Sequence, residues 1–265
     1  MKRPTLDPEW PEEVVEIHRN DMREMWDRTI EPQIFNAYHN QLDLYRELVD
    51  RYGAHSILDI GCAQATLALL LAEEGKRVTA VDIRASFIDY AKTRYERGDI
   101  RFVAGNAFDL DDLGTFDLVF ANQIIEHLVR PAEFLRKVAE FVRSGGIVVV
   151  STPNHDYFRS PFPSFTELGD PAQHAHREFS AGASDHFFAY TEEELRAAAR
   201  DAGLEVAEVR YFETPFISGH VLIRYLHKFT PPSILRPFDR IALRIAPRKL
   251  AHQLCFVLRK PEGRA

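Results

Sequence analysis

The sequence has few cysteines and no long apolar run, and both shortages exclude classes of protein. Only two of the 265 residues are cysteine, Cys62 and Cys255, so we expect no disulfide framework and a reducing, cytoplasmic setting. No segment approaches the ~18 apolar residues of a membrane span. The first ten residues, MKRPTLDPEW, lack the apolar core of a secretory signal. The sequence therefore predicts a globular protein without a transmembrane segment.

Charge is distributed unevenly along the chain. The net charge is −7, but the segment from His220 to the end carries ten Lys and Arg against two acids, or +8. The rest of the chain then carries −15, the difference between −7 and +8. The basic segment suits an anionic partner or surface, self-association, or simply a solvated face. The acidic remainder argues against a general nucleic-acid footprint, so nucleic acid is not an expected partner.

Short apolar runs alternate with helical stretches from Ser56 onward. Strands are predicted over Ser56–Ile60, Arg77–Asp82, Ile100–Ala104, Phe116–Ala121, Ile147–Ser151, Leu204–Tyr211 and Leu254–Arg259. Helices are predicted over Gln64–Glu74, Ala85–Glu96 and from Pro131 to about Val142, with Gly145–Gly146 as a break before the next strand. This alternation is typical of an α/β protein with a doubly wound parallel sheet.

The sequence also predicts how the chain is divided into a helical N-terminal part, a core with a long loop, and an insertion. Residues 1–52 are expected to be helical, and residues 53–211 and 252–260 to form the core. Within the core, 153–190 is a long loop, and loops of that length are usually functional. It ends where Thr191 and Glu194 form a capping-box pattern. Residues 212–251 are predicted as a helical insertion, which is a cap, a dimer face or a membrane-surface element.

The turn after the first strand is poor in glycine. It reads Gly61-Cys62-Ala63-Gln64-Ala65-Thr66, whereas a dinucleotide fingerprint needs Gly-x-Gly-x-x-Gly. Only Gly61 matches, and the Gly-Lys-Ser/Thr ending of a phosphate-binding loop is missing as well. Both observations disfavour a nicotinamide-dependent reductase or a nucleotide triphosphatase.

Two carboxylates flank this turn. Asp59 lies two positions before Gly61, and Asp82 ends the second predicted strand. A carboxylate repels a pyrophosphate but attracts a cation, and S-adenosylmethionine carries a sulfonium and an ammonium group without any phosphate. A carboxylate at the end of the second strand can accept hydrogen bonds from ribose hydroxyls. The alternative is that each Asp merely favours the start of the following helix.

The segment Ile57–Asn154 resembles the core of class I, Rossmann-like S-adenosylmethionine-dependent methyltransferases, in the group of the ubiquinone-pathway O-methyltransferases. Asp59, Gly61, Ala63 and Ala65 stand at the positions of the family's Asp-x-Gly-x-Gly-x-Gly motif, with alanine at two glycine positions. Other resembling segments are Ala80-Val81-Asp82-Ile83, Gly105-Asn106-Ala107-Phe108, Asn122–Leu128 and Ser151–Asn154.

The resemblance implies a fold, a cofactor and a set of binding residues. The fold is a mostly parallel seven-stranded sheet whose last strand is antiparallel, and the cofactor is S-adenosyl-L-methionine. Asp82 would hold the ribose and Ile83 would pack on adenine. The N-terminal helices would form a lid in which Tyr38 and His39 close over the cofactor. The full set of cofactor-binding residues is Asp59, Gly61, Cys62, Ala63, Asp82, Ile83, Asn106, Ala107, Asn122, Gln123 and Tyr38.

Two histidines are candidates for a catalytic base. Methyl transfer is an in-line displacement in which the protein aligns the acceptor and can remove its proton. His127 follows the fourth predicted strand and ranks first, with Glu126 either orienting it or serving the structure. His186, before the capped helix, ranks second. His174 and His176 could join His186 at a metal, but no cysteine accompanies them and we expect no metal.

The acceptor remains open at this point. We expect an O or N atom of a small or lipid-linked metabolite, such as a saccharide, a quinone or a natural product. The alternatives are a non-catalytic module that keeps the fold, and an RNA-directed methyltransferase. Monomer and homodimer are both compatible with the sequence, and peripheral membrane contact remains one interpretation of the basic insertion.

Overall fold

The computed structural model describes residues 1–106, 109, 113–177, 188–218, 227–230 and 232–262. Its strands form a seven-stranded sheet in the order β3-β2-β1-β4-β5-β7-β6. Strands β1, β2 and β3 pair in parallel, as do β4 and β5, and β7 runs antiparallel to both of its neighbours, β5 and β6. The predicted α/β class, with a mostly parallel sheet and an antiparallel last strand, is confirmed. Within the described residues no helix is both long and apolar enough to cross a membrane.

The chain divides into two compact units, Met1–Asp111 with Glu213–Ala242, and Asp112–Phe212 with Leu243–Ala265. The first unit holds the parallel strands β1 (Ser56–Ile60), β2 (Arg77–Asp82) and β3 (Asp99–Ala104). Its helices are α1 (Glu12–Asp21), α2 (Pro32–Arg51), α3 (Thr66–Glu73), α4 (Ala85–Arg94) and α7 (Pro215–Ser218), with most of α8 (Pro232–Ile245).

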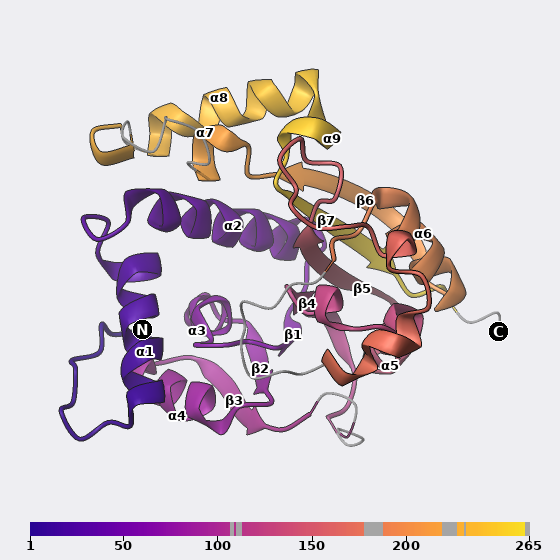
Figure 1. The fold of residues 1–265 in the computed structure, drawn as a ribbon. Helices are drawn as coiled ribbons and strands as arrows, with labels where there is room; N and C mark the ends of the chain where they lie inside the picture. Colours follow the sequence, from indigo (N-terminus) through magenta and orange to yellow (C-terminus); the bar gives the residue numbers. More distant parts are fainter. Residues whose placement is uncertain (107–108, 110–112, 178–187, 219–226, 231, 263–265) are drawn as a thin grey trace. The chain divides into compact units, whose positions relative to one another are not determined.

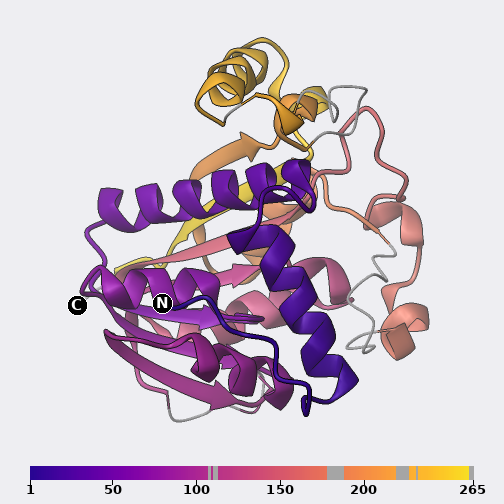
Figure 2. The ribbon, with the colours of Figure 1, turned by 90° about the vertical axis from the view of Figure 1, so that its left-hand side faces the viewer.

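The N-terminal helices pack on other helices of this first unit. Between α1 and α2 lies a π-helical segment, η1 (Met22–Trp26), within the residues 1–52 that the sequence predicts as helical. The main chain before α1 runs past α4, and the N–H of Lys2 donates to the carbonyl of Arg94 at 2.9 Å (Figure 2). Helix α1 packs against α4, and α2 packs against η1, α3 and α7.

The second unit holds the strands β4 (Phe116–Asn122), β5 (Val142–Pro153), β6 (Glu205–Phe212) and β7 (Gln253–Arg259). Its α-helices are α5 (Pro131–Glu140), α6 (Glu192–Asp201) and α9 (Pro247–Leu250). Short 3-10 turns lie at η3 (Ile125–His127), η4 (Thr166–Leu168) and η5 (Pro171–Arg177). All these elements are labelled in Figure 1 or lie between labelled neighbours.

The break predicted at Gly145–Gly146 is wrong, because β5 runs through both glycines. The pairing of β4 with β5 shifts register between Phe116 and Leu118, which absorbs the extra residues as a bulge. Gly145 takes a φ of 73°, a value that favours glycine. A Cβ on Gly146 would lie 2.7 Å from Val142 Cγ1. The glycines therefore permit a bulge and a close approach rather than ending the strand.

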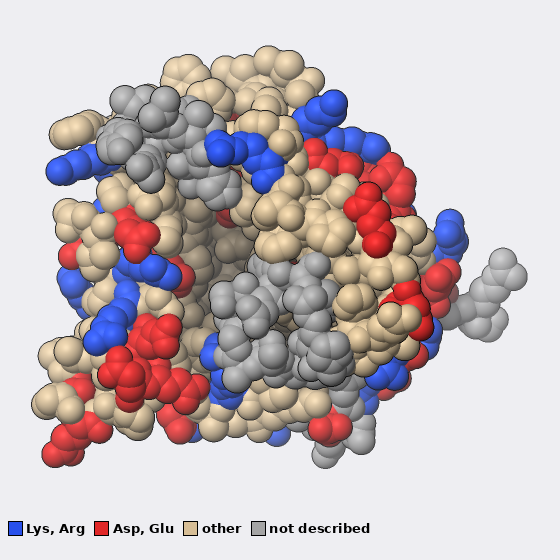
Figure 3. All heavy atoms as spheres, in the orientation of Figure 1, with Lys and Arg blue, Asp and Glu red and all other residues tan. Residues whose placement is uncertain are grey.

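The visible charges are mixed rather than segregated. On the face shown in Figure 3, Lys and Arg atoms alternate with Asp and Glu atoms along both edges of the described surface. The excess of basic residues in the last 46 positions, from His220 to Ala265, therefore does not translate into one large basic area on this face.

Candidate active site

The turn between β1 and α3 is built from residues in the left-handed region of backbone space. Gly61 has φ 68°, Ala63 has φ 46° and Ala65 has φ 56°. Such values cost an alanine roughly 1–2 kcal/mol relative to ordinary conformations. The alanines thus adopt the conformations for which the family's motif uses glycine. Because the conformation is unfavourable in itself, other contacts must hold it.

Backbone and carboxylate acceptors supply those contacts. The N–H of Cys62 donates to the carbonyl of Val81 in β2 at 3.0 Å, and the N–H of Ala63 donates to Asp82 Oδ2 at 2.9 Å. The N–H of Ala65 donates to the carbonyl of Cys62 at 2.7 Å, which closes the turn. The end of β2 therefore fixes the shape of the turn that follows β1.

A buried arginine holds the other end of the same turn. Arg94, the last residue of α4, is fully buried, and its Nη1 donates to the carbonyl of Gln64 at 2.7 Å and to Thr66 Oγ1 at 2.9 Å. Its Nη2 lies 3.0 Å from Asp21 Oδ1 at the end of α1, and Asp21 is fully buried too. Arg94 thereby links the turn to the N-terminal helix.

The Asp21 carboxylate is itself fixed by two neutral donors. Tyr90 donates its hydroxyl to Asp21 Oδ2 at 2.8 Å, and Trp26 donates its Nε1–H to the same oxygen at 2.9 Å. Burial raises the pKa of Asp21, while Arg94 and these donors oppose that rise. The network joins α1, η1 and α4 to the turn, and sequence reasoning did not find it.

The two carboxylates predicted beside the turn do lie beside it. Asp59 in β1 is only 4% exposed, and burial, reinforced by the charge of Asp82, raises its pKa to about 7. Burial also raises the pKa of Asp82, although the backbone N–H groups of Arg84 and Ala63 lower it. Two buried carboxylates that repel each other form an environment that favours a cation.

Three other predicted cofactor residues follow β2 and β3. Ile83 is 53% exposed although it is apolar, so its side chain is available for stacking. Asn106 lies just after β3, is half-buried, and accepts the N–H of Asp109 on its backbone carbonyl at 3.0 Å. Ala107 lies outside the described residues.

Tyr38 and His39, the two residues of the predicted lid, make contacts with different parts of the chain. The Tyr38 hydroxyl lies 3.5 Å from Gln64 Nε2, at the turn. His39 instead lies 3.3 Å from the carbonyl of Met25 through its Nε2, and it stacks on Phe35. Tyr38 thus reaches the predicted cofactor turn, whereas the described contacts of His39 are with the N-terminal segment.

A third acidic residue joins the turn from the N-terminal segment. Gln64 Nε2 donates to Glu24 Oε2 at 2.5 Å. Burial raises the pKa of Glu24 to about 7, and the hydrogen bond from Gln64 opposes the rise. Glu24 was not among the sequence candidates, because it lies in η1, forty residues before its partner.

In the second unit, the amides at the end of β4 bind β5 and β7. Asn122 Oδ1 accepts the hydroxyl of Ser151 at 3.1 Å. Gln123 has φ 54°, and its Nε2 donates to Ser151 Oγ at 3.2 Å and to Gln253 Oε1 at 3.0 Å. The strand ends therefore form a polar cluster in which both predicted amides take part.

The histidine that ranks first as a base lies in η3, directly after this cluster. His127 is half-buried, and its N–H donates to the carbonyl of Ile124 at 2.9 Å. Glu126 is fully buried, its Oε2 accepts the Thr152 hydroxyl at 3.1 Å, and burial raises its pKa to about 8. The candidate base ranked second, His186, lies outside the described residues.

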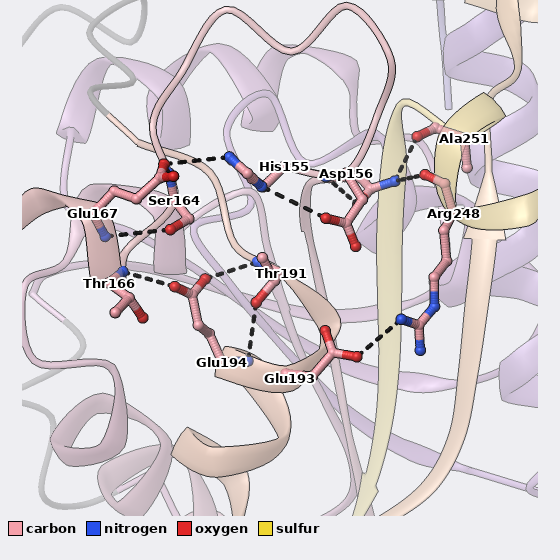
Figure 4. A network of polar contacts seen from close by, with 11 residues as sticks. His155, Asp156, Ser164, Thr166, Glu167, Thr191, Glu193, Glu194, Arg248 and Ala251 are labelled. Carbon is pink, nitrogen blue, oxygen red and sulfur yellow. Dashed lines mark hydrogen bonds and ion pairs between the residues drawn. The ribbon is translucent and has the colours of Figure 1, made fainter.

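The predicted capping box at α6 is confirmed and has a second role. Thr191 accepts the N–H of Glu194, and Glu194 accepts the N–H of Thr191 at 2.8 Å. Glu194 Oε1 also accepts the N–H of Thr166 at 2.7 Å, as Figure 4 shows. The cap thus ties one turn of the long loop to the start of α6.

Two residues at the start of this loop, Asn154 and His155, make further polar contacts. His155 lies 3.6 Å from the Asp156 carboxylate and 3.5 Å from the Glu167 carboxylate (Figure 4). Asn154 Nδ2 donates to the carbonyls of Arg248 and Ala251 at 2.7 and 2.8 Å. The ion-pair contacts of His155 therefore lie within the loop itself. Among the described residues, His155 and its two carboxylates included, no three His, Cys, Asp or Glu residues gather as a metal site; the His176 side chain and His186 are not described.

A family model described as a methyltransferase domain matches residues 35–209, which include the turn, both carboxylates and His127. The chain belongs to this family and is a class I S-adenosylmethionine-dependent methyltransferase. Its cofactor is S-adenosylmethionine, as the resemblance implies.

Two curated relatives of this methyltransferase carry the same name, ubiquinone biosynthesis O-methyltransferase. The protein from Aromatoleum aromaticum is 30% identical over 191 residues, which cover 69% of this chain and 78% of the relative. The protein from Bordetella avium is 28% identical over 212 residues, or 76% and 86% of the two chains. Both alignments extend well beyond the motifs.

Solved structures show the same fold at low identity. The methyltransferase is similar to magnesium protoporphyrin IX methyltransferase from Synechocystis with bound S-adenosylhomocysteine, with a TM-score of 0.60, 12% identity and 94% of each chain covered. It is also similar to the N-methyltransferase NodS from Bradyrhizobium japonicum, with a TM-score of 0.55, 16% identity and coverage of 94% and 98%.

Proposed function

We propose that this methyltransferase transfers a methyl group to a hydroxyl oxygen of a small or lipid-linked metabolite of the quinone class. The observation that carries the proposal is the 30% identity, over 78% of its length, to a ubiquinone biosynthesis O-methyltransferase. Both free cysteines are buried thiols, which suits a reducing, cytoplasmic setting.

The residues of the first unit fit the cofactor. The Asp82 carboxylate ends β2, where it can accept ribose hydroxyls, and the exposed side chain of Ile83 follows directly for packing on adenine. The Asp59 carboxylate supplies negative charge that favours a cationic nucleoside. The turn residues Gly61 and Ala63 present a backbone that is already bent away from the strand. Tyr38 reaches the same turn and would cover the bound ligand.

The chemistry divides between cofactor and protein. When bound, S-adenosylmethionine supplies a methyl group on a sulfonium, which needs no further activation. The chain must orient the acceptor hydroxyl and remove its proton, and His127 would accept that proton in its neutral form. Glu126, which accepts the Thr152 hydroxyl, would hold the turn that carries His127.

The test is methyl transfer to matched acceptors. We would incubate the purified protein with S-adenosylmethionine and a panel of hydroxylated quinone precursors, simple catechols and the corresponding amines, and follow product mass and S-adenosylhomocysteine. We expect transfer to hydroxylated rings and much slower transfer to amines. Transfer to the amines alone, or cofactor binding without transfer to any hydroxylated ring, would contradict the proposal.

A further inference from the structure

Helix α8 has one buried face and one exposed apolar face. Leu235, Asp239 and Ala242 are buried on one side. On the other side, four large apolar side chains are at least half exposed: Ile234 at 50%, Phe238 at 54%, Ile241 at 54% and Ile245 at 78%. We refer to these four residues as the α8 stripe. Scattered apolar residues are normal on a protein surface, but an aligned group of this kind marks a contact surface.

The spacing of the α8 stripe places its members on one line. They follow one another by four, three and four positions, which is the repeat of a single helix face. The stripe extends over eleven residue steps, or about 16 Å of helix. Phe229, 80% exposed, precedes the helix and adds to the apolar surface near its start.

Contacts on the opposite face hold α8 in this orientation. Arg236 Nη1 lies 2.6 Å from Asp43 Oδ2 of α2, and the buried Asp239 accepts the N–H of Thr214 at 2.8 Å. Both contacts belong to the first unit. Because they fix the rotation of the helix, the stripe cannot turn inward without breaking them.

The charges beside the stripe are of one sign. Arg240 and Arg244 are exposed and lie about 100° round the helix from the stripe, on its solvent side. The one acid on the helix, Asp239, is buried, so among the described exposed positions of α8 the only charged side chains are arginines. In Figure 3 the described atoms at the position of α8 are mostly tan.

We propose that α8 docks this protein on an anionic lipid surface. The α8 stripe would enter the boundary between headgroups and acyl chains, and Arg240 and Arg244 would reach the phosphates. The inference is independent of the proposed function, since it uses no residue of the candidate active site.

The charges favour a lipid surface over a second copy of the chain. If two α8 helices packed antiparallel about a twofold axis, the arginine side of one would lie against the arginine side of the other. With no exposed acid described on the helix, those like charges would repel. A bilayer containing acidic lipids supplies both an apolar layer and the opposite charge.

Vesicle binding of the full-length protein tests the inference. Sedimentation would use vesicles of phosphatidylcholine alone and of phosphatidylcholine with an equal amount of phosphatidylglycerol. We expect binding to the mixed vesicles that weakens with added salt, and little binding to phosphatidylcholine alone. Phe238→Ser should weaken binding to mixed vesicles about tenfold. Arg240→Gln and Arg244→Gln should each weaken it about fivefold.

Matched surface variants serve as controls. Leu6 is 51% exposed and the Arg97 side chain is 76% exposed, both away from α8, so Leu6→Ser and Arg97→Gln should bind vesicles like the wild type. Thermal unfolding and S-adenosylmethionine affinity show that each variant is folded. Unchanged vesicle binding in folded Phe238→Ser would overturn the inference. Absence of binding to the mixed vesicles would overturn it as well. A concentration-dependent dimer that Phe238→Ser abolishes would then assign the stripe to a second copy of the chain.

Discussion

The guanidinium of Arg94 lies 3.0 Å from the carboxylate of Asp21, with both side chains fully buried. The pair connects the last residue of α4 to the last residue of α1, and the same guanidinium binds the carbonyl of Gln64 in the turn after β1. One buried cation therefore holds together the N-terminal helix and the predicted cofactor turn.

Removal of that cation should destabilise the protein strongly. Arg94→Leu leaves the buried Asp21 charge without its partner, and we expect the free energy of unfolding to fall by about 3–5 kcal/mol. Urea unfolding measures it. Arg19→Leu is the control, because its pair with Glu12 is exposed on both sides and should contribute less than about 1 kcal/mol. Adding Asp21→Asn to Arg94→Leu should recover part of the lost free energy of unfolding. If Arg94→Leu lowers that free energy no more than Arg19→Leu does, the proposed role of the buried pair is contradicted.

The ribose role of Asp82 predicts a loss of cofactor affinity. Asp82→Ala should weaken S-adenosylmethionine binding at least tenfold, or about 1.4 kcal/mol, measured by isothermal titration. Asp89→Ala, at an exposed position of α4, should leave the affinity unchanged. Because Asp82 also accepts the N–H of Ala63, the unfolding midpoint of each variant must be compared. Wild-type affinity in Asp82→Ala would refute the ribose role.

The raised pKa of Asp59 predicts a pH dependence of binding. Burial shifts this pKa from 3.8 to about 7, so the free protein holds the group partly protonated near neutral pH. A cationic ligand favours the ionised form, and affinity should therefore rise between about pH 6 and pH 8, with proton release on binding. Titration in buffers of different ionisation enthalpy measures that release, and Asp59→Asn should reduce it by the share that Asp59 contributes.

The raised pKa of Asp59 also makes the stability of the folded protein depend on pH. Since the folded state holds the proton on Asp59 more tightly than the unfolded state, the contribution of Asp59 to the stability of the free protein should decline as pH rises from 3.8 to about 7, and should not change above that range. Asp59→Asn should flatten this part of the stability profile. A profile identical to that of the wild type would show that Asp59 does not carry the effect.

The left-handed alanines predict different effects of two similar substitutions. Ala63 is half-buried with φ 46°, so Ala63→Gly should relieve backbone strain and stabilise the protein by about 0.5–1 kcal/mol. Ala65 is fully buried, and Ala65→Gly also loses packing of its methyl, which should bring the change close to zero. Ala68→Gly, inside α3, should destabilise by about 1 kcal/mol and calibrates the measurement.

His127 is expected to affect turnover rather than cofactor binding. His127→Gln should lower kcat by about 10²–10⁴ for a hydroxyl acceptor, while S-adenosylmethionine affinity stays unchanged. His55→Gln, at an exposed histidine before β1, should leave both unchanged. Unaltered kcat in His127→Gln would remove His127 from the role and direct the search to His186.

Local signals predicted most of the fold. Apolar alternation located β1 and β2 at their observed bounds, and the Thr191–Glu194 pattern predicted the start of α6. The error at Gly145–Gly146 arose because glycine often ends an element, whereas here it permits a bulge that depends on the neighbouring strand. Such a dependence on pairing cannot be deduced from one segment alone.

The site residues at the strand ends could be predicted from the sequence, whereas those that depend on distant partners could not. Asp59 and Asp82 could be found because their order along the chain fixes their place in a parallel sheet. Arg94 and Asp21 act through partners distant in sequence. A signal did exist, because Arg94 lies on the same helix face as the buried Tyr90 and Ala91. A charged residue on an apolar face indicates a buried partner.

The position of β7 sets the order in which the second unit can be completed. Strands β5 and β6 are not neighbours, and β7, which begins 41 residues after Phe212 at Gln253, lies between them. During synthesis, β6 leaves the ribosome well before its sheet partner exists, and until then both flanking strands present open edges that can pair with other chains. A ribosome that stalls before Gln253 would therefore release an aggregation-prone product, because this half of the sheet can be completed only after β7 has been synthesised.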